Sequence, residues 1–234
     1  MTKTILILGG SSGTGLHLAR HYVAEGHRVC ITGRRAPDLP GALFHPLDVT
    51  ADAGVLGRDL DGLVAAVPGV QTLINAAGYL QRGPIERLDD SALQTMTNLG
   101  LLAPMMLAAR LKPRAPTPLK LMLIPSSSAH TPRPMEPAYA ATKAGLDMLG
   151  ASLARDPGIG KVLVVAPSGI ATPFWTGTDE DTTTMLDPAW VAERIVDLSS
   201  GAFKYRHARL LRNPARVEVL ETLDDRFRPV GQPG

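Results

Sequence analysis

The stretch ILILGGSSGTGLHLAR, residues 5–20, joins a short apolar run to an amphipathic pattern through a glycine-rich loop. Gly9, Gly13 and Gly15 lie between the predicted strand and the predicted helix, where glycine permits tight turns and close approach of a ligand. The N-terminus of such a helix offers free N–H groups and a positive dipole to a phosphate. A glycine-rich turn without a ligand is the alternative, but the strand before the loop and the helix after it favour a phosphate site.

Short apolar runs alternate with longer amphipathic patterns over the first 170 residues. Several runs are apolar at consecutive positions, as expected for strands that are covered on both faces. The runs lie at residues 2–9, 27–33, 42–49, 70–78, 119–127 and 161–169. This alternation predicts a doubly wound α/β fold in which a mostly parallel sheet of about seven strands carries helices on both faces.

The C-terminal third has a looser pattern. Residues 175–187 are polar and rich in turn formers, a helix is predicted near 188–199, and residues 206–212 and 217–221 compete for the last strand. We see no internal repeat or change of composition that would mark a boundary, so residues 1–234 are expected to form one domain.

Composition excludes several classes of protein. The 234 residues are 44% hydrophobic and 20% charged with a net charge of +2, and the Lys and Arg are scattered, so we expect no nucleic-acid partner. No apolar run approaches the roughly 20 residues that span a bilayer, and the opening MTKTILILGG is too short for a signal-peptide core. The single cysteine, Cys30, fits a reducing compartment. We therefore expect a cytoplasmic protein without a membrane partner.

The second predicted strand ends in ITGRR, residues 31–35. In a dinucleotide-binding half, an acidic side chain at this strand's tip favours the ribose 2′-OH of NAD, whereas arginine accommodates the 2′-phosphate of NADP. Arg34 and Arg35 stand where the acid would be, and a guanidinium group suits a phosphate. NADP(H) is the predicted cofactor, with two solvated surface arginines as the alternative.

Two further loops follow predicted strands. Asp48 could accept a hydrogen bond from an adenine amino group, or could cap a helix that begins near Asp52. The residues Asn75, Ala76, Ala77 and Gly78 are small enough to let the backbone pass close to a cofactor. Either segment alone is about as consistent with a structural role as with a functional one.

With these motifs in hand, the chain resembles the short-chain dehydrogenase/reductase family in its single-domain, NADP-preferring, Rossmann-like form. The resemblance covers about residues 3 to 175. The matching positions are Gly9, Gly13, Gly15, Asp48-Val49-Thr50, Asn75-Ala76-Ala77-Gly78, Asn98, Ser126, Tyr139, Lys143 and Pro167-Ser168-Gly169-Ile170-Ala171-Thr172. These motifs occur in the order and at the spacings of the family, which makes six of them together a specific signal.

The resemblance implies roles for individual residues. Tyr139 would be the general acid/base, Lys143 would hold the nicotinamide ribose and lower the tyrosine pKa, and Asn98 would help to order a proton relay. A serine would hydrogen-bond the substrate oxygen. The implied cofactor-binding set comprises Gly9, Ser11, Ser12, Gly13, Thr14, Gly15, Arg34, Arg35, Asp48, Val49, Asn75, Ala76, Ala77, Gly78, Tyr139, Lys143, Pro167, Ile170 and Thr172.

Elementary chemistry supports the pairing of Tyr139 with Lys143. A free tyrosine titrates near pH 10, so acid/base work near neutrality benefits from a positive charge, and residues i and i+4 of a helix share a face. The family's serine usually lies thirteen residues before the tyrosine, which selects Ser126 and leaves Ser127 in reserve. Pro125, directly before it, has no functional explanation from sequence.

The substrate side is less defined. His130, Phe174 and Trp175 are expected near the substrate mouth with Ser127, although a surface imidazole is the stronger interpretation of His130. Residues from about 174 to 200 are expected to cover the site. The six histidines have no metal-ligand spacing, so no metal site is predicted.

The predicted function is NADP(H)-dependent interconversion of a ketone or aldehyde and its alcohol, in a homotetramer or homodimer. A non-catalytic NADP-binding sensor or scaffold is one alternative. A member of the same family that acts on C=N or C=C bonds, or as an epimerase, is the other.

Overall fold

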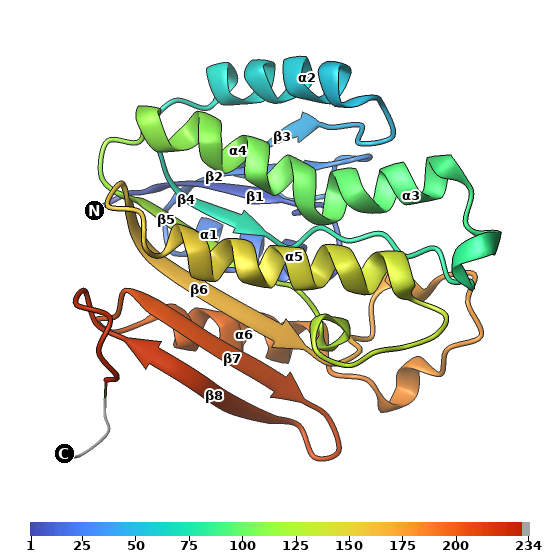
Figure 1. Ribbon diagram of the computed structural model, residues 1–234. Helices are drawn as coiled ribbons and strands as arrows, with labels where there is room; N and C mark the ends of the chain where they lie inside the picture. Colours follow the sequence, from blue (N-terminus) through green and yellow to red (C-terminus); the bar gives the residue numbers. More distant parts are fainter. Residues whose placement is uncertain (231–234) are drawn as a thin grey trace.

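A central eight-stranded sheet organises the chain, which the computed structural model describes for residues 1–230 (Figure 1). The strands are β1 (Thr4–Leu8), β2 (Arg28–Gly33), β3 (Ala42–Pro46), β4 (Val70–Asn75), β5 (Leu119–Leu123), β6 (Ile159–Pro167), β7 (Tyr205–Leu211) and β8 (Arg216–Leu223). Their order across the sheet is β3-β2-β1-β4-β5-β6-β7-β8. Strands β1 to β7 pair in parallel and β8 pairs antiparallel with β7. The predicted doubly wound α/β fold is confirmed.

Both candidates for the last strand are strands. Residues 206–212 correspond to β7 and residues 217–221 lie within β8, and the two form a hairpin at one edge of the sheet. The sheet therefore has eight strands, one more than predicted. The sequence does not separate the two candidates because β8 is an edge strand whose residues are mostly exposed, so its pattern lacks the apolar run of a buried strand.

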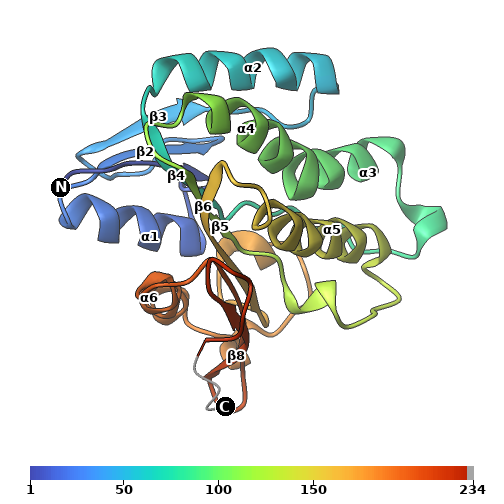
Figure 2. The same ribbon diagram turned by 60° about the vertical axis from the view of Figure 1, so that its left-hand side comes forward.

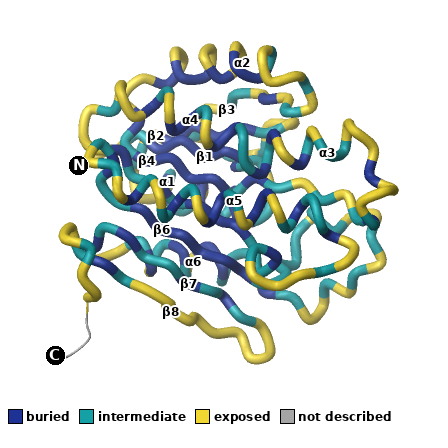
Figure 3. The backbone as a smooth tube through the Cα atoms, viewed as in Figure 1, coloured by how far each residue is buried: buried dark blue, intermediate teal, exposed yellow. Residues whose placement is uncertain are grey.

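Helices cover both faces of the sheet (Figure 2). On one face lie α2 (Ala53–Ala66), α4 (Ala103–Leu111) and α5 (Pro137–Leu153), and on the other lie α1 (Gly13–Ala24) and α6 (Pro188–Ser199). α3 (Asp90–Thr97) leads into α4 through a π-helical turn at Asn98–Leu102. Two apolar layers fill the space between helices and sheet, one including Leu60 and Leu107, the other Leu18 and Ile195. The buried interior follows the strands (Figure 3).

The strand order reverses direction at β1, which has β2 on one side and β4 on the other. The chain leaves β1 toward α1 on one face and leaves β4 toward the opposite face. In open α/β sheets this divergence creates a crevice at the carboxyl ends of the strands, where ligands bind. The fold thus places a crevice beside the glycine-rich loop.

The segment expected to cover the site, residues 174–200, is only partly available for that role. Its second half is α6, whose Val191 and Ile195 are fully buried against the sheet. The apolar positions of this helix face the core, which fixes it as part of the fold. The candidate covering segment therefore narrows to residues 174–187. A 3-10 turn, Pro173–Trp175, lies at its start, and a second one, Thr182–Thr184, lies within it.

Within residues 1–230, no helix combines the length and the apolar character needed to cross a bilayer.

Candidate active site

Two glycine positions at the β1–α1 junction have no room for a side chain. Gly9 has φ of +81°, and a Cβ built on it would lie 2.7 Å from the Ala77 Cα. A Cβ on Gly15 would lie 2.1 Å from the Gly9 carbonyl oxygen. The loop is therefore folded tightly against the end of β4, and glycine is required at both positions.

A hydroxyl from the neighbouring strand braces this loop. The Gly9 N–H donates to the Thr32 Oγ1 over 3.2 Å, and Thr32 is fully buried in β2. Many members of the resembled family have a threonine directly before the first glycine, where this chain has Leu8. The bracing hydroxyl thus comes from β2, a substitution that sequence reasoning did not identify.

The N-terminus of α1 is suited to an anion. Its N-cap residue, Ser12, makes no side-chain capping hydrogen bond, and the first turn contains no acidic residue. The Thr14 hydroxyl is buried and has no hydrogen-bond partner in the part of the chain that the structure describes. Because the first N–H groups of a helix lack intrahelical partners, they are available to a phosphate here.

A cleft of about 550 Å³ opens at the carboxyl ends of the central strands. Most of the predicted cofactor residues line it. They are Gly9, Ser11, Ser12, Gly13, Thr14, Arg34, Asp48, Val49, Ala76, Ala77, Gly78, Tyr139, Lys143, Pro167, Ile170 and Thr172. Three predicted residues lie outside the lining: Gly15 packs behind Gly9, Asn75 is fully buried, and Arg35 is exposed at the surface.

The two interpretations of Asp48 are separated by its contacts. Asp52, and not Asp48, caps α2, since its Oδ1 accepts from the N–H groups of Gly54 and Val55. Asp48 Oδ1 instead accepts from the N–H and the hydroxyl of Thr50, and the residue lines the cleft. Asp48 therefore shapes the turn after β3 and faces the cleft.

Three of the four predicted catalytic residues meet in the cleft. Tyr139 and Lys143 lie one turn apart on α5 and are both buried, and the Lys143 Nζ donates to the Ala77 carbonyl oxygen over 3.1 Å. Ser126 follows the end of β5 and lines the same cleft. Pro125 lies beyond the β5 ladder, which ends at Leu123, so its missing N–H removes no sheet hydrogen bond.

Burial dominates the titration of this pair. It raises the pKa of Tyr139 well above its ordinary value, against an opposing hydrogen bond from Ser126. It lowers the pKa of Lys143 from 10.5 to about 8. Desolvation disfavours the charged form of both groups, and a lowering of the tyrosine pKa by Lys143 stays a prediction.

Asn98 holds two elements together from behind the cleft. Its side-chain N–H₂ donates to the carbonyl oxygens of Val49 and Ala51, each over 2.8 Å. The backbone carbonyl oxygen of Asn98 accepts a hydrogen bond from the Ala103 N–H in the π-helical turn. These contacts fix the loop after β3 against the start of α4; a role in a proton relay stays a prediction.

The second and third serines turn away from the cleft. The Ser127 hydroxyl accepts from Arg133 over 3.1 Å, and the buried Ser128 hydroxyl donates to Glu136 over 2.8 Å. Neither residue belongs to the lining of the cleft within the described chain, and a role for Ser127 in place of Ser126 stays a prediction. The 3-10 turn Ser127–Ala129 rotates these side chains toward α5.

His130 lies against α5, where its exposed imidazole agrees with the interpretation as a surface residue. Its Nε2 lies 2.6 Å from the Asp147 Oδ2 on α5, and it does not belong to the lining of the cleft. The sequence gives no signal for this contact, since the partners are 17 residues apart on different elements.

Two aromatic residues belong to the wall of the cleft. Phe174 and Trp175 line the cleft, and the Phe174 ring centre lies 6.0 Å from that of Tyr139. The Trp175 Nε1 donates to the Ile170 carbonyl oxygen over 2.9 Å. They form an apolar wall beside the tyrosine.

An ion pair connects the covering segment to the loop after β4. Arg82, in the loop after β4, pairs with Glu180, and it also lies 4.0 Å from the buried carboxylate of Glu136. Asp181 accepts from the Thr183 N–H and starts the second 3-10 turn. Within the acidic run at residues 179–181, Glu180 and Asp181 therefore have partners in the fold.

A doubly wound sheet with a glycine-rich loop, an arginine at the tip of β2 and a buried Tyr–Lys pair defines a dinucleotide-binding oxidoreductase site. Comparison with known proteins agrees. The model of the short chain dehydrogenase family matches residues 3–183, and the chain belongs to this family.

Similar proteins span most of the chain. It is 28% identical over 225 residues to the 3-oxoacyl-[acyl-carrier-protein] reductase MabA of Mycobacterium tuberculosis, covering 93% of this chain and 83% of MabA. It is 31% identical over 166 residues to the serine 3-dehydrogenase of Rhizobium radiobacter, and the match covers 67% of this chain and 66% of that enzyme. The fold is similar to that of the 3-ketoacyl-(acyl-carrier-protein) reductase of Brucella melitensis complexed with NADH, with a TM-score of 0.77 and 21% identity over 91% of this chain and 97% of that one.

Proposed function

We propose that this short-chain dehydrogenase is an NADP(H)-dependent enzyme that interconverts a ketone or aldehyde and its alcohol. The observation that carries the proposal is the position of Ser126, Tyr139 and Lys143 in the lining of one cleft with the glycine loop and Arg34. Proton transfer and cofactor binding would then take place side by side.

The cleft fits the nicotinamide dinucleotide that this family uses. Ser12 and Gly13 at the N-terminus of α1 would hold the pyrophosphate, and the unpartnered Thr14 hydroxyl gives a further donor. Ile170 and Thr172 would meet the nicotinamide end, since they line the cleft beside Tyr139. When bound, the cofactor supplies or accepts the hydride.

The chain's own groups would handle the substrate oxygen. The Ser126 hydroxyl would donate to that oxygen and orient it toward Tyr139. Because burial raises the pKa of Tyr139, the neutral phenol is its dominant form, and this form can donate a proton to a carbonyl oxygen during reduction. Lys143 would anchor the cofactor ribose and would supply positive charge beside the phenol. Phe174 and Trp175 would exclude water from the substrate carbon.

The preference for NADP(H) rests on Arg34. It lines the cleft directly after β2, whereas its neighbour Arg35 lies outside, so the pair provides a matched control. We expect Arg34→Asp to weaken NADPH binding by about 100-fold and NADH binding far less, because a carboxylate repels the 2′-phosphate. Arg35→Asp should change both affinities little. Equal losses in the two variants would contradict the assignment of Arg34.

The test of the activity is NADPH oxidation with a panel of ketones and aldehydes. The panel includes a 3-oxoacyl thioester, since a similar protein is named for that class. Tyr139→Phe should bind NADPH as the wild type does and should lose about 10²–10⁴-fold in kcat. Equal turnover by both proteins would refute the mechanism. Tight NADPH binding without turnover of any substrate would favour a sensor or scaffold.

We further infer a homo-oligomer, dimer or tetramer, that acts in the cytoplasm. The exposed Met105 on α4 and Met148 on α5 offer apolar side chains for contact between copies along these helices. Light scattering after gel filtration measures the mass, and a monomer at micromolar concentration would contradict the inference.

A further inference from the structure

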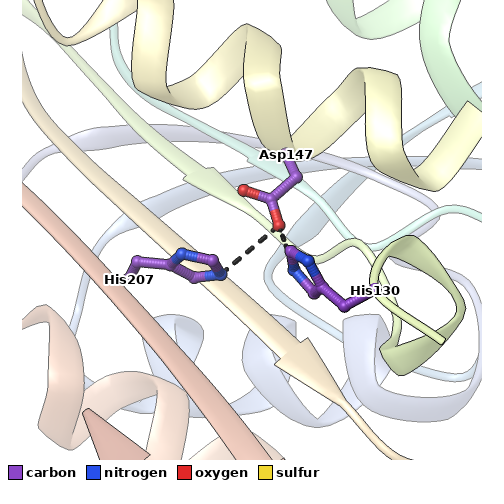
Figure 4. Close-up of side chains that lie close together, drawn as sticks. All are labelled: His130, Asp147 and His207. Atoms are coloured by element: carbon purple, nitrogen blue, oxygen red, sulfur yellow. Dashed lines mark ion pairs between the residues drawn. The ribbon is translucent and has the colours of Figure 1, made fainter. Parts of the chain in front are cut away.

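Two histidines and an aspartate from three separate elements converge outside the cleft (Figure 4). His130 follows the 3-10 turn Ser127–Ala129, Asp147 lies on α5, and His207 lies in the middle of β7. The Asp147 Oδ2 lies 2.6 Å from the His130 Nε2 and 3.3 Å from the His207 Nε2. The three potential ligand atoms all lie within 4.8 Å of one another.

The polar atoms of this cluster are close together but are not all satisfied by hydrogen bonds. The Asp147 Oδ2 and the His207 Nε2 are buried and have no hydrogen-bond partner of acceptable geometry within residues 1–230. Asp147 itself is only 8% exposed. The carboxylate oxygen thus lies between two imidazole nitrogens, and either a shared proton or a bound cation would hold such a set of atoms together.

The ligand chemistry identifies the kind of ion. Imidazole nitrogens together with a carboxylate oxygen bind Zn²⁺ and similar first-row cations, commonly with three protein ligands and one water. Ligand bonds of about 2.0–2.1 Å in a tetrahedral site place neighbouring ligand atoms roughly 3.3 Å apart. The contact of Asp147 with His207 has this length. The contact with His130 is shorter, so metal binding would move the His130 side chain, which is the most exposed of the three.

We propose that His130, Asp147 and His207 form a binding site for one divalent transition-metal cation of the zinc class. The His130 side chain is 31% exposed, against 11% for Asp147 and 13% for His207, so water and metal would enter from the His130 side. The opposite strand adds a second acidic residue nearby, because Glu221 of β8 pairs with His207 in the sheet register.

The site would connect the catalytic elements to the C-terminal hairpin. His130 lies four residues after Ser126, and Asp147 lies one helical turn after Lys143. His207 belongs to β7, which pairs with β6 on one side and β8 on the other. A bound cation would therefore fix the turn after Ser126 against α5 and β7 and would stabilise the folded chain by mass action.

Zinc binding by the whole protein tests the site without reference to activity. After dialysis against a chelator, equilibrium dialysis with ZnSO₄ and metal analysis should find one Zn²⁺ per chain, and Zn²⁺ should raise the melting temperature. Co²⁺ should give the visible absorption of a tetrahedral site. Asp147→Asn, His207→Asn and His130→Ala should each weaken Zn²⁺ binding by about tenfold or more. The matched control is His45→Ala, which removes a histidine from β3 at the far side of the sheet and should bind as the wild type does.

Circular dichroism of each variant separates loss of a ligand from loss of the fold. If a buried variant does not fold, His130→Ala decides, because this side chain is the most exposed of the three. Absence of stoichiometric Zn²⁺ binding by the wild type at about 100 μM metal would overturn the proposal. Equal binding by all variants would also overturn it, since the metal would then be on other surface groups. In either case, a proton shared among the imidazoles and the carboxylate would explain the cluster.

Discussion

The Lys143 ammonium nitrogen lies 5.5 Å from the centre of the Tyr139 ring, one turn further along α5. The lysine side chain is almost fully enclosed, and its one hydrogen bond within the described chain goes to the Ala77 carbonyl oxygen. A cation held in this way costs stability, since burial lowers the pKa of Lys143 from 10.5 to about 8. The buried position of Lys143 thus lowers the stability of the folded protein, although it places the lysine beside Tyr139.

Lys143→Met should therefore make the cofactor-free protein more stable at pH 7 while it removes activity. The change of pKa corresponds to about 3 kcal/mol, and the lost hydrogen bond to Ala77 returns part of it, so we expect a gain of about 2 kcal/mol in the free energy of unfolding. Urea titration of both proteins measures this difference.

The pH dependence of the same pair of proteins gives a second check. Because the folded pKa of Lys143 lies below the unfolded one, the unfolded chain binds more protons between pH 8 and pH 10.5. The unfavourable free energy of burying the charged Lys143 side chain is fully present below pH 8 and decreases as the pH rises from 8 to 10.5. The advantage of Lys143→Met should accordingly shrink by pH 10, and a constant advantage from pH 7 to pH 10 would contradict the buried-charge explanation.

Replacement of glycine by alanine should have opposite effects on stability at Gly15, which follows the β1 strand, and at Gly62 in α2. Gly15→Ala places a methyl group 2.1 Å from the Gly9 carbonyl oxygen, which is backbone, so we expect a loss of about 2 kcal/mol or more and no measurable NADPH binding. Gly62→Ala lies on the exposed side of α2 with nothing within 4 Å and should stabilise the protein by about 0.5–1 kcal/mol. Thermal melts and cofactor titration of the two variants measure the changes in stability and in NADPH binding. If the protein tolerated alanine at position 15, the loop would not be packed as described.

Local patterns were sufficient for the parts of the fold that depend on neighbours in sequence. The consecutive apolar residues of β1 and β6 reveal strands covered on both faces, and the spacing from Tyr139 to Lys143 places both on one side of α5. The edge strand β8 was ambiguous because burial, which creates the apolar pattern, is absent along most of it.

Contacts between distant segments could not be read from the chain. His130, Asp147 and His207 meet only because α5 packs over β5 and β6, next to β7, and no spacing in the sequence encodes that crossing. The pairing of Arg82 with Glu180 spans 98 residues, so no local pattern in the sequence reveals it. Such contacts need the three-dimensional register of the elements.

The ion pair of Arg82 with Glu180 should keep the covering segment closed. Both side chains are about one-third exposed, so the pair contributes at most about 1 kcal/mol after screening by solvent. Glu180→Gln should increase the rate of proteolytic cleavage within residues 176–181 by about threefold to fivefold, because local opening becomes easier. Asp179→Asn removes the neighbouring charge and should leave the rate unchanged. Salt should accelerate cleavage of the wild type and not of Glu180→Gln.

Thr32 offers a test of how the glycine loop is held in the absence of the usual threonine at position 8. Thr32→Val keeps the shape of the side chain but leaves the Gly9 N–H without its partner, so we expect a loss of about 1–2 kcal/mol in stability and severalfold weaker NADPH binding. Thr72→Val makes the same exchange at a buried position of β4 and should change neither quantity by more than about 0.5 kcal/mol, because no hydrogen bond of the Thr72 hydroxyl is found in residues 1–230. Equal effects of the two substitutions would mean that the hydroxyl of Thr32 does not brace the loop and that Leu8 packing alone maintains it.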